Sequence, residues 1–197
     1  HCVTRRQRQM CIRDSLLIKA YAKVCRNQRY IRNIPALVIA GPGIESPFGR
    51  KCIKLCHANY LKVYIAGKPM IDDAQIIFTG MLSGEAKWGA IYGSEAFVLP
   101  SHQENFGIAV VEALACGKPV LISNKINIWQ EIGHSGAGIV SDDTLQGTIE
   151  VLDSWLRMDK HEQAEMIDKT KKCFEDNFEI KVAAHRLIKE LRRSLAQ

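Results

Sequence analysis

The sequence predicts an α/β fold, a doubly wound parallel sheet followed by a helical C-terminal tail. Short runs rich in Val, Ile and Leu, such as ALVIA and PVLIS, are continuous rather than alternating, as in strands buried on both faces. Segments with helical spacing separate these runs, which is the order of a doubly wound sheet. Several of the runs end in Gly, Pro or Ser, residues that favour turns.

The elements follow one another in a regular order. The first is a helix over residues 16–24, where LLIKAYAKV repeats apolar residues at helical spacing. Four more helices are expected at residues 50–62, 84–92, 107–116 and 127–132. The expected strands are residues 36–40, 76–80, 96–101, 119–123 and 136–140. Three helices over residues 144–158, 161–177 and 180–194 form the predicted tail, which spans residues 143–197.

The N-terminal residues do not fit this pattern. Residues 5–15, RRQRQMCIRDS, resemble one reading frame of a sequencing-library adaptor, residue for residue. We therefore exclude residues 1–15 from the fold as an artefact expected to be disordered, and assign residues 16–197 to one domain. A basic arm for nucleic acid or an anionic membrane is the alternative. Because no strand precedes the first helix, we expect the first strand of the sheet to be missing and the reading frame truncated.

Charge and cysteine content exclude several classes of protein. The formal net charge is +6, and without the four arginines and one aspartate of residues 1–15 it falls to +3. No remaining stretch clusters Lys and Arg around aromatic residues, so no nucleic-acid partner is expected. Five cysteines lie outside residues 1–15 and none forms a CxxC pair, which argues against a disulfide framework or a zinc site. Cys52, Cys56 and His57 could share a helix face but are not expected to bind metal.

No apolar run approaches the roughly 20 residues that a membrane span requires. A signal peptide with a long apolar core and a small-residue cleavage site is also not recognisable. The expected location is the cytoplasm, with peripheral association of the full enzyme with a membrane as an alternative.

Common nucleotide-binding motifs fail on spacing. The dinucleotide fingerprint requires a third glycine three residues after the second. After Gly41 and Gly43 that position is Ser46, so the fingerprint is not present. Gly117 and Lys118 are followed by Pro119, which does not fit a P-loop, so Gly117 is interpreted as the cap at the end of a helix. A nucleophile elbow and a HExxH motif are absent.

The segment SHQENFGIAVVEALACGKPV sets two glutamates eight residues apart, Glu104 before a predicted helix and Glu112 inside it. Gly107 stands where that helix begins, and the free N–H groups and dipole of a helix N-terminus attract phosphate. Eight helical residues span about 12 Å, comparable with the separation of hexose and ribose in a sugar nucleotide. Taken alone, two surface glutamates would explain the same spacing.

The Glu-x7-Glu spacing with Phe-Gly after the first Glu resembles the donor-binding signature of retaining GT-B glycosyltransferases of family 4, glycosyl transferases group 1. The resemblance extends over residues 16–140, including LVIAGPG, IIFTGML, AFVLPS and the IWQEI helix, in the order of the family. It implies a Rossmann-like domain, the C-terminal, nucleotide-sugar-binding half of a GT-B fold.

The resemblance also implies roles for individual residues. Glu104 would be the catalytic-site glutamate that contacts the donor hexose near its reacting face, and Glu112 would bind the ribose. His102 and Gln103 would make local loop contacts, with a catalytic base at His102 as an alternative. The remaining donor-binding positions, next to the sugar, diphosphate or nucleobase, would be Asn105, Phe106, Gly107, Ile108, Gly80, Met81, Leu82, Gly41 and Gly43.

The sequence departs from the family pattern at the N-terminus. The family supplies an Arg and a Lys from its first strand-loop to neutralise the leaving diphosphate, and no residue here takes those roles. The acceptor-binding N-terminal domain is also not recognisable. We therefore expect this fragment to be inactive alone, although the intact enzyme would move a hexose from a nucleotide donor to an acceptor hydroxyl with retention.

The resemblance implies no cofactor and no divalent metal, since the partner is the nucleoside-diphosphate sugar itself. Two other interpretations stay open at this point. One is another GT-B enzyme, such as a sugar-nucleotide epimerase or a phosphorylase, although no motif for a pyridoxal-phosphate lysine is evident. The other is a non-catalytic Rossmann-like interaction domain.

Overall fold

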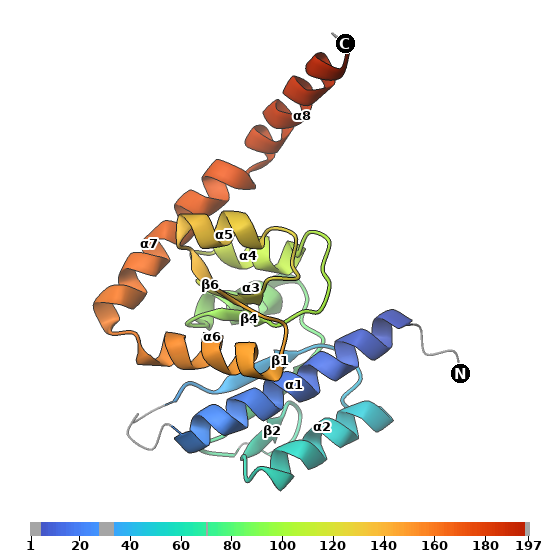
Figure 1. Ribbon diagram of the computed structural model, residues 1–197. Coiled ribbons are helices and arrows are strands. Elements are labelled where there is room, and N and C mark those ends of the chain that lie inside the picture. The colour runs from blue at the N-terminus through green and yellow to red at the C-terminus, as the bar shows by residue number, and fades with distance from the viewer. Residues whose placement is uncertain (1–4, 28–33, 70, 196–197) are drawn as a thin grey trace.

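The computed structural model describes residues 5–27, 34–69 and 71–195 of the 197-residue chain (Figure 1). Within these residues the chain forms two parallel three-stranded sheets with helices on both sides (Figure 1). The predicted α/β class and the parallel arrangement of the strands are therefore confirmed. The division of the strands into two separate sheets was not predicted.

The first sheet has the order β1-β3-β2. Strand β1 (Leu37–Ala40) and strand β2 (Val63–Ile65) flank β3 (Ile76–Gly80), and both pair with it in parallel. The central strand therefore holds its two neighbours in one register, with Leu37 and Val63 both opposite Ile76.

Strand β2 is absent from the sequence prediction, which extended the preceding helix to residue 62. Helix α2 (Pro47–Ala58) ends four residues earlier. Tyr60 adopts a left-handed conformation with φ of 60°, which turns the chain out of the helix and into β2. A strand of three residues is too short to give a recognisable apolar pattern.

The second sheet has the order β4-β5-β6, with strands β4 (Phe97–Leu99), β5 (Val120–Ser123) and β6 (Gly138–Ser141). All four residues of the central strand β5 are buried. Leu121 belongs to one hydrophobic cluster, and Val120 and Ile122 belong to another, because successive side chains of a strand point to opposite faces. Helices therefore cover both faces of this sheet.

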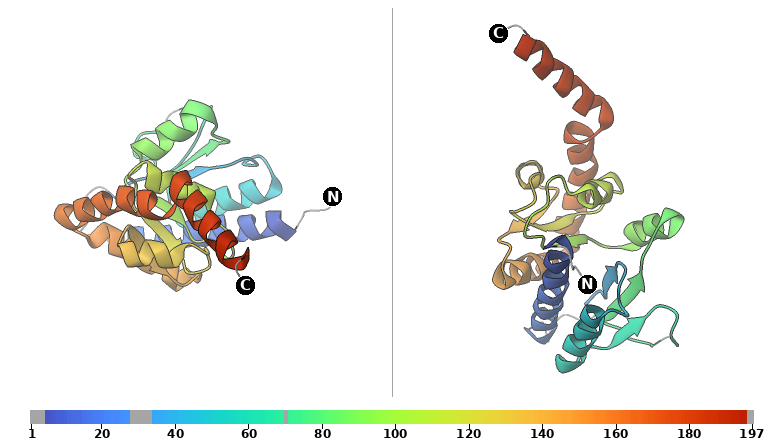
Figure 2. Two further views of the ribbon diagram at one scale, coloured as in Figure 1. Left: turned by 90° about the horizontal axis from the view of Figure 1, so that it is seen from above. Right: turned by 90° about the vertical axis from the view of Figure 1, so that its right-hand side faces the viewer.

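The helices form a layer on each side of the sheets (Figures 1 and 2). One layer contains α1 (Arg5–Asn27), α2 and α6 (Leu145–Arg157). The other contains α3 (Gly84–Gly93), α4 (Ile108–Ala115), α5 (Trp129–Ser135) and α7 (Lys160–Asn177). This two-layer arrangement is that of a doubly wound domain.

Side chains cap several helices in this arrangement. The Ser46 hydroxyl accepts a hydrogen bond from the Gly49 N–H at 3.0 Å, and the Thr144 hydroxyl accepts one from Gly147 at 3.0 Å. Asp159 and Glu162 form a complete capping box at the start of α7. These caps satisfy N–H groups that a helix leaves unpaired at its start.

The C-terminal tail consists of α6, α7 and α8 (Ile180–Leu195), three helices where three were predicted. Helix α6 packs on the second sheet, whereas α8 continues from α7 and extends away from both sheets (Figures 1 and 2). No helix within the described ranges combines the length and apolar content needed to cross a bilayer.

Helix α1 begins at Arg5, within the segment that was expected to be disordered, and residues 1–4 lie outside the described residues. The disorder expected for residues 1–15 stays a prediction. Once a helix is nucleated, each added residue gains one backbone hydrogen bond, which allows α1 to extend toward the N-terminus. Burial raises the pKa of Asp14 in this segment to about 6. The adaptor origin of residues 5–15 stays a prediction.

We expect Gly138→Ala to destabilise the domain by about 2 kcal/mol or more. A Cβ at Gly138 would lie 2.1 Å from the Val120 carbonyl oxygen and 2.7 Å from Val120 Cγ2, so β5 and β6 would have to separate. Urea denaturation measures the free energy of unfolding. The control is Gly89→Ala in α3, where the added methyl group meets open space. The free energy of unfolding of this variant should rise by up to about 1 kcal/mol, because alanine favours helix more than glycine does. Equal midpoints for the two variants would contradict the close packing of β5 and β6.

Candidate functional site

The residues predicted to bind a ligand lie in loops that follow the carboxyl ends of strands. Gly41 follows β1, Met81 follows β3, and the segment 100–107 follows β4. The first two loops are joined, since the Gly41 N–H donates to the Gly80 carbonyl oxygen at 2.9 Å. In open α/β sheets this edge is where ligands bind, so the topology supports the predicted location.

Backbone hydrogen bonds hold the segment after β4 against the loop between β5 and α5. The Glu104 N–H donates to the Lys125 carbonyl at 3.2 Å, and the Asn127 N–H donates to the Glu104 carbonyl at 3.2 Å. The Ser123 hydroxyl also donates to the Ser101 carbonyl. Glu104 is therefore fixed at its backbone, although it lies in a loop.

Gly107 begins α4 in a left-handed conformation, with φ of 67° and ψ of 53°. A Cβ at this position would lie 3.1 Å from Ile126 Cγ2 and 3.4 Å from Val110 Cγ2. Within the described residues no side chain caps this helix N-terminus, so its first N–H groups remain available to a ligand. The left-handed turn and the limited space explain why glycine stands here.

Glu112 lies in the second turn of α4 and forms an ion pair with Lys87 of α3. Lys87 Nζ is 2.7 Å from Glu112 Oε1, and the two side chains are 35% and 26% exposed. The Lys87 ammonium also lies over the Trp88 ring, 4.1 Å from its centroid. Sequence analysis missed Lys87, because no local spacing links it to Glu112.

The two glutamates have different surroundings. The Glu104 side chain is partly exposed, and its Cγ would be 3.6 Å from a Cβ at Gly107. Within the described residues its carboxylate forms neither a hydrogen bond nor an ion pair, whereas Lys87 holds the Glu112 carboxylate. One carboxylate thus lies beside the start of α4, and the other is directed toward α3.

Three other predicted residues are largely exposed at this edge of the domain. Asn105 and Ile108 face solvent, with Ile108 67% exposed. The Phe106 ring makes an edge-to-face contact with Phe178, which follows α7, with 6.2 Å between the ring centroids. The Phe106 ring therefore contacts Phe178, while its backbone directly precedes Gly107 at the start of α4.

A charged cluster lies on the other side of the same loop. His102 Nδ1 is hydrogen-bonded to the Asp143 carboxylate, and Arg13 Nη2 lies 3.2 Å from Asp143 Oδ2. Arg13 Nη1 also donates to the Asp143 carbonyl at 2.6 Å. Burial alone would raise the pKa of Asp143, but the hydrogen bond with His102 and the charges of His102, Arg13 and Lys125 outweigh it and lower that pKa.

Cys52, Cys56 and His57 do not converge on one point in the structure. Cys52 and Cys56 are buried in the cluster beneath α1 and α2, whereas His57 is exposed, so the three side chains do not converge. Across the described part of the chain, no group of three or more His, Cys, Asp or Glu side chains could hold a metal ion. Burial raises the pKa of the Cys56 thiol to about 11, which keeps it neutral.

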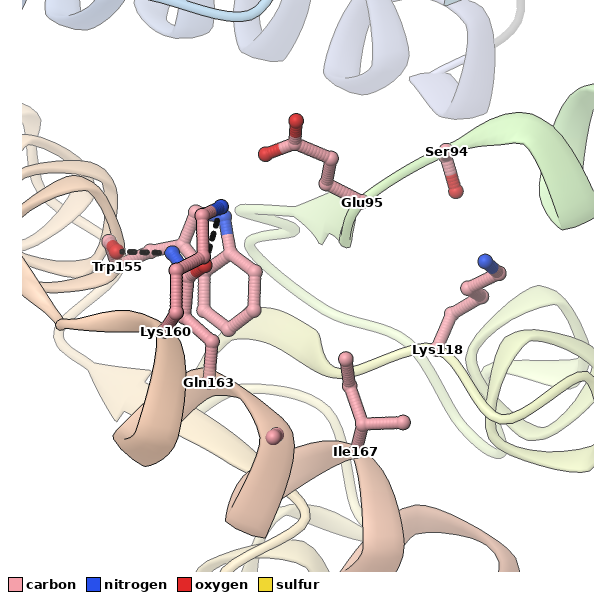
Figure 3. Close-up of a pocket in the computed structure, with 8 residues that line it drawn as sticks. Ser94, Glu95, Lys118, Trp155, Lys160, Gln163 and Ile167 are labelled. Carbon is pink, nitrogen blue, oxygen red and sulfur yellow. Dashed lines mark hydrogen bonds between the residues drawn. The ribbon is translucent and has the colours of Figure 1, made fainter.

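A cavity of about 300 Å³ opens on another part of the molecule (Figure 3). It is lined by residues of α6 and α7 together with Ser94, Glu95 and Lys118, which precede β4 and β5 (Figure 3). The cavity therefore lies at the amino ends of these strands, opposite the predicted crevice, and contains none of the predicted binding residues.

Comparison with known proteins agrees with the fold. The sequence profile of glycosyl transferases group 1 matches residues 15–173. An uncharacterized glycosyltransferase of Methanocaldococcus jannaschii is 30% identical over 86 residues, which cover 41% of this chain and 22% of that protein. The chain spans between 12% and 28% of the length of the curated relatives that it matches.

Solved structures of other proteins share the architecture. The Anabaena protein HepE, solved in complex with UDP and glucose, superposes with a TM-score of 0.67 at 16% identity, over 90% of this chain and 44% of that one. The C-terminal domain of the group 1 glycosyltransferase LpcC from Francisella tularensis gives 0.63 at 18% identity, over 85% of this chain and 80% of that one. At these identities the similarity shows the fold alone.

We expect Asp143→Asn to lower the thermal midpoint near neutral pH, by an amount equivalent to about 1–2 kcal/mol. The folded-state pKa of Asp143 lies below its ordinary value of 3.8, so the ionised carboxylate stabilises the fold above that pH. This contribution is lost as the pH falls through the folded-state pKa, and the two midpoints should converge there. Thermal unfolding measured across pH tests this.

Asp168→Asn on the exposed face of α7 is the matched control. Its thermal midpoint should stay close to that of the native chain at every pH. If the thermal midpoints of the native chain and Asp143→Asn differ by the same amount down to strongly acidic pH, Asp143 is not ionised in the folded state, which would contradict this prediction.

Proposed function

Because the chain belongs to the glycosyl transferases group 1 family, we propose that it binds the nucleotide-sugar donor of a retaining glycosyltransferase of family 4. The observation that carries this proposal is the start of α4. There, an uncapped helix N-terminus opened by a left-handed glycine lies at the carboxyl edge of the sheet, with a glutamate before it and another in its second turn.

The diphosphate of the donor would dock at the N-terminus of α4. The free N–H groups of the first turn can donate to phosphate oxygens, and the helix dipole favours the negative charge. Gly107 lacks a side chain and so allows a ligand to approach the backbone closely. The hydrogen bonds of Glu104 to Lys125 and Asn127 keep the preceding loop in place, so little ordering would be needed on binding.

The two carboxylates would bind the two ends of the donor. Glu104, whose carboxylate has no partner within the described residues, would accept hydrogen bonds from the hexose hydroxyls near the reacting carbon. Glu112 would accept hydrogen bonds from the ribose diol. Lys87 supports this role, because its ion pair orients the Glu112 carboxylate and offsets a negative charge that would otherwise repel the diphosphate.

The remaining predicted residues would complete the crevice. Gly80, Met81 and Leu82 would border the nucleobase, and Gly41 and Gly43 would border the same crevice, supported by the hydrogen bond that joins these two loops. Asn105, Phe106 and Ile108 would contribute backbone next to the sugar and diphosphate. The related fold of HepE, solved with UDP and glucose, supports a nucleoside diphosphate as the ligand.

In the whole enzyme we propose transfer of a hexose to an acceptor hydroxyl with retention at the anomeric carbon. Catalysis would depend on orientation of the donor and on electrostatic stabilisation of the departing diphosphate, without a metal ion. The acceptor would bind to an N-terminal domain across the crevice, in a cytoplasmic enzyme for which peripheral membrane attachment is the alternative location.

We expect isothermal titration to detect binding of at least one nucleoside diphosphate from a panel of UDP, GDP, ADP and CDP, also in the presence of a chelator. Glu112→Gln should weaken that binding about tenfold, because a charged acceptor for the ribose hydroxyls is lost. The corresponding 2′,3′-dideoxy nucleotide should bind Glu112→Gln at least as tightly as the native chain, since it has no diol to bind and the variant removes a negative charge.

Glu175→Gln on the exposed face of α7 is the control and should bind like the native chain. Absence of binding by every nucleotide would favour a non-catalytic interaction domain. Binding that Glu112→Gln leaves unchanged would show that the ribose role is wrong.

We also expect no sugar transfer by the purified chain from any nucleotide sugar to a water-soluble acceptor or to detergent-solubilised lipid. One wall of the crevice, which would hold the acceptor, is outside this domain in our proposal. Chromatographic detection of a glycosylated product, at a rate above that of heat-denatured protein, would contradict the proposed inactivity.

A further inference from the structure

The charges of this chain are divided unevenly along the sequence. Residues 16–69 contain 10 Lys and Arg but only one Asp or Glu, Glu45, which gives them a net charge of +9. Residues 70–197 contain 13 Lys and Arg and 19 Asp and Glu, which gives them a net charge of −6. Such an asymmetry indicates a partner of opposite charge for the basic part. The inference drawn from it does not depend on the proposed function.

The structure brings many of these cations onto one face of the domain. Helix α1 packs against α2, and Figures 1 and 2 show the two helices side by side, at the end of the molecule opposite α8. The buried sides of both helices enter the same hydrophobic cluster, so their exposed sides face outward together. The exposed cations of this basic face are Lys19, Lys23 and Arg26 of α1 and Arg50, Lys51 and Lys54 of α2.

Spacing places the cations of each helix on one side. Lys19, Lys23 and Arg26 follow one another at intervals of four and three residues, which is the spacing of neighbours on a helix surface. Lys51 and Lys54 are three residues apart in α2. The basic face therefore has two rows of positive charge on adjacent helices, which sequence analysis did not detect because the two rows lie in different segments.

The protein does not neutralise these charges. Among the residues that the structure describes, no carboxylate forms an ion pair with a cation of the basic face. The Arg50 guanidinium donates to the backbone carbonyl of Glu45 instead, and its positive charge persists. Neighbouring like charges repel one another, and a negatively charged surface bound to the basic face would remove this repulsion.

An exposed tyrosine lies where α2 ends. The Tyr60 N–H donates to the His57 carbonyl and the Leu61 N–H to the Cys56 carbonyl, the two hydrogen bonds of a Schellman motif. Tyr60 takes the left-handed position of this motif, with φ of 60°, where glycine is usual because a Cβ is unfavourable. Its side chain is 91% exposed. Folding alone would favour glycine here, so the tyrosine indicates a contact outside the domain.

We propose that the basic face docks on the surface of a bilayer that contains anionic lipids, with the Tyr60 side chain among the lipid headgroups. The negative potential of such a surface attracts Lys and Arg side chains that lie close to it. Tyrosine is enriched at the interface between bilayer and water, since its ring is apolar and its hydroxyl is polar. The two features of the face, clustered cations and one exposed aromatic side chain, therefore fit the same partner.

The shape and composition of the face favour a bilayer over a nucleic acid. Single-stranded nucleic acids bind to aromatic side chains on which their bases stack, and the described side chains of α1 and α2 include no exposed aromatic one. A helix that reads duplex DNA enters the major groove, whereas α1 and α2 lie side by side in one layer (Figure 1). Two adjacent helices instead present a surface on which a bilayer can rest.

Docking through the basic face leaves the carboxyl ends of the strands accessible. Helices α1 and α2 pack on one side of the first sheet, whereas the loops that contain Gly41, Met81 and Gly107 follow the ends of strands. Lipid binding and nucleotide binding can therefore be measured separately, and failure of one leaves the other standing.

Co-sedimentation with vesicles provides the first test. The chain should bind vesicles of equal parts phosphatidylserine and phosphatidylcholine at least about tenfold more tightly than vesicles of phosphatidylcholine alone. The difference should decrease as salt is added, because salt screens exposed charges. Equal binding to both kinds of vesicle, or binding to neither, would overturn the proposal.

A triple variant with Lys19→Gln, Lys23→Gln and Lys54→Gln tests the face itself. It should bind the anionic vesicles at least about tenfold more weakly than the native chain. Because these side chains are exposed, the variant should keep the thermal midpoint of the native chain to within a few degrees. The matched control removes the same charge from three exposed lysines of α7, Lys160, Lys171 and Lys172.

A second control distinguishes the face from the residues at the start of the chain. It carries Arg5→Gln, Arg6→Gln and Arg8→Gln, which remove three cations that precede the basic face in α1. Both controls should weaken binding less than the variant of the face does. A loss of binding in either control as large as that in the variant of the face would overturn the proposal.

Tyr60→Gly separates a role in docking from a role in folding. Glycine adopts the left-handed conformation more readily, so the thermal midpoint should rise. Binding to anionic vesicles should nevertheless weaken about threefold, because an aromatic anchor at the interface is lost. Unchanged vesicle binding would overturn the proposed contact of Tyr60 with the headgroups.

Nucleic acid is the alternative partner that the same proteins can test. Fluorescence anisotropy measures binding of a labelled single-stranded RNA and of a labelled DNA duplex. Absence of binding, at a salt concentration at which the anionic vesicles bind, would support a bilayer. Binding of either nucleic acid under conditions in which the vesicles do not bind, lost in the variant of the basic face, would overturn it.

Discussion

Strand β5 is the element on which the arrangement of the second half of the molecule depends. It pairs with β4 on one side and β6 on the other, and its side chains enter both hydrophobic clusters. The loop after β5 forms two backbone hydrogen bonds with Glu104, through Lys125 and Asn127. The same strand therefore positions the segment that precedes α4. A change in its packing would therefore disturb the sheet, both helix layers and the candidate site together.

The candidate site depends on a second constraint, the charges that surround the start of α4. Carboxylates near a site for an anion would repel it unless their charge is offset. Lys87 provides this for Glu112. Arg13 does so for Asp143 on the other side of the loop, where His102 is hydrogen-bonded to the same carboxylate. Glu104 remains without a partner within the described residues, which is consistent with a side chain that is kept for a ligand.

The separation of the two sheets connects the fold with the site. A doubly wound sheet binds its ligand beyond the carboxyl ends of its strands, and the loops after β1, β3 and β4 contain the predicted binding residues. The hydrophobic cluster under α1 and α6 still bridges the two halves, so helix packing holds the domain together across the boundary. The predicted binding residues thus lie in loops that follow strands of both sheets.

Much of this arrangement could be predicted because it depends on local properties of the chain. Continuous apolar runs such as VLIS identify buried strands, and Gly107 and Gly117 mark the two ends of α4, since a left-handed conformation favours glycine at both. The family was recognised from the segment that carries Glu104 and Glu112, and the profile match agrees with it. The roles of these residues stay predictions.

The remaining features were decided by contacts between distant parts of the chain. Strand β2 is three residues long and exists because β3 pairs with it, and α1 reaches back to Arg5 while Arg13 contacts Asp143. The partner of Glu112 comes from a different helix, 25 positions away along the chain. The sequence by itself determined most of the helices and strands, because periodicity and turn residues act locally. Only the tertiary structure decided which strands pair and which charges meet, because pairing and burial depend on where the segments lie in space.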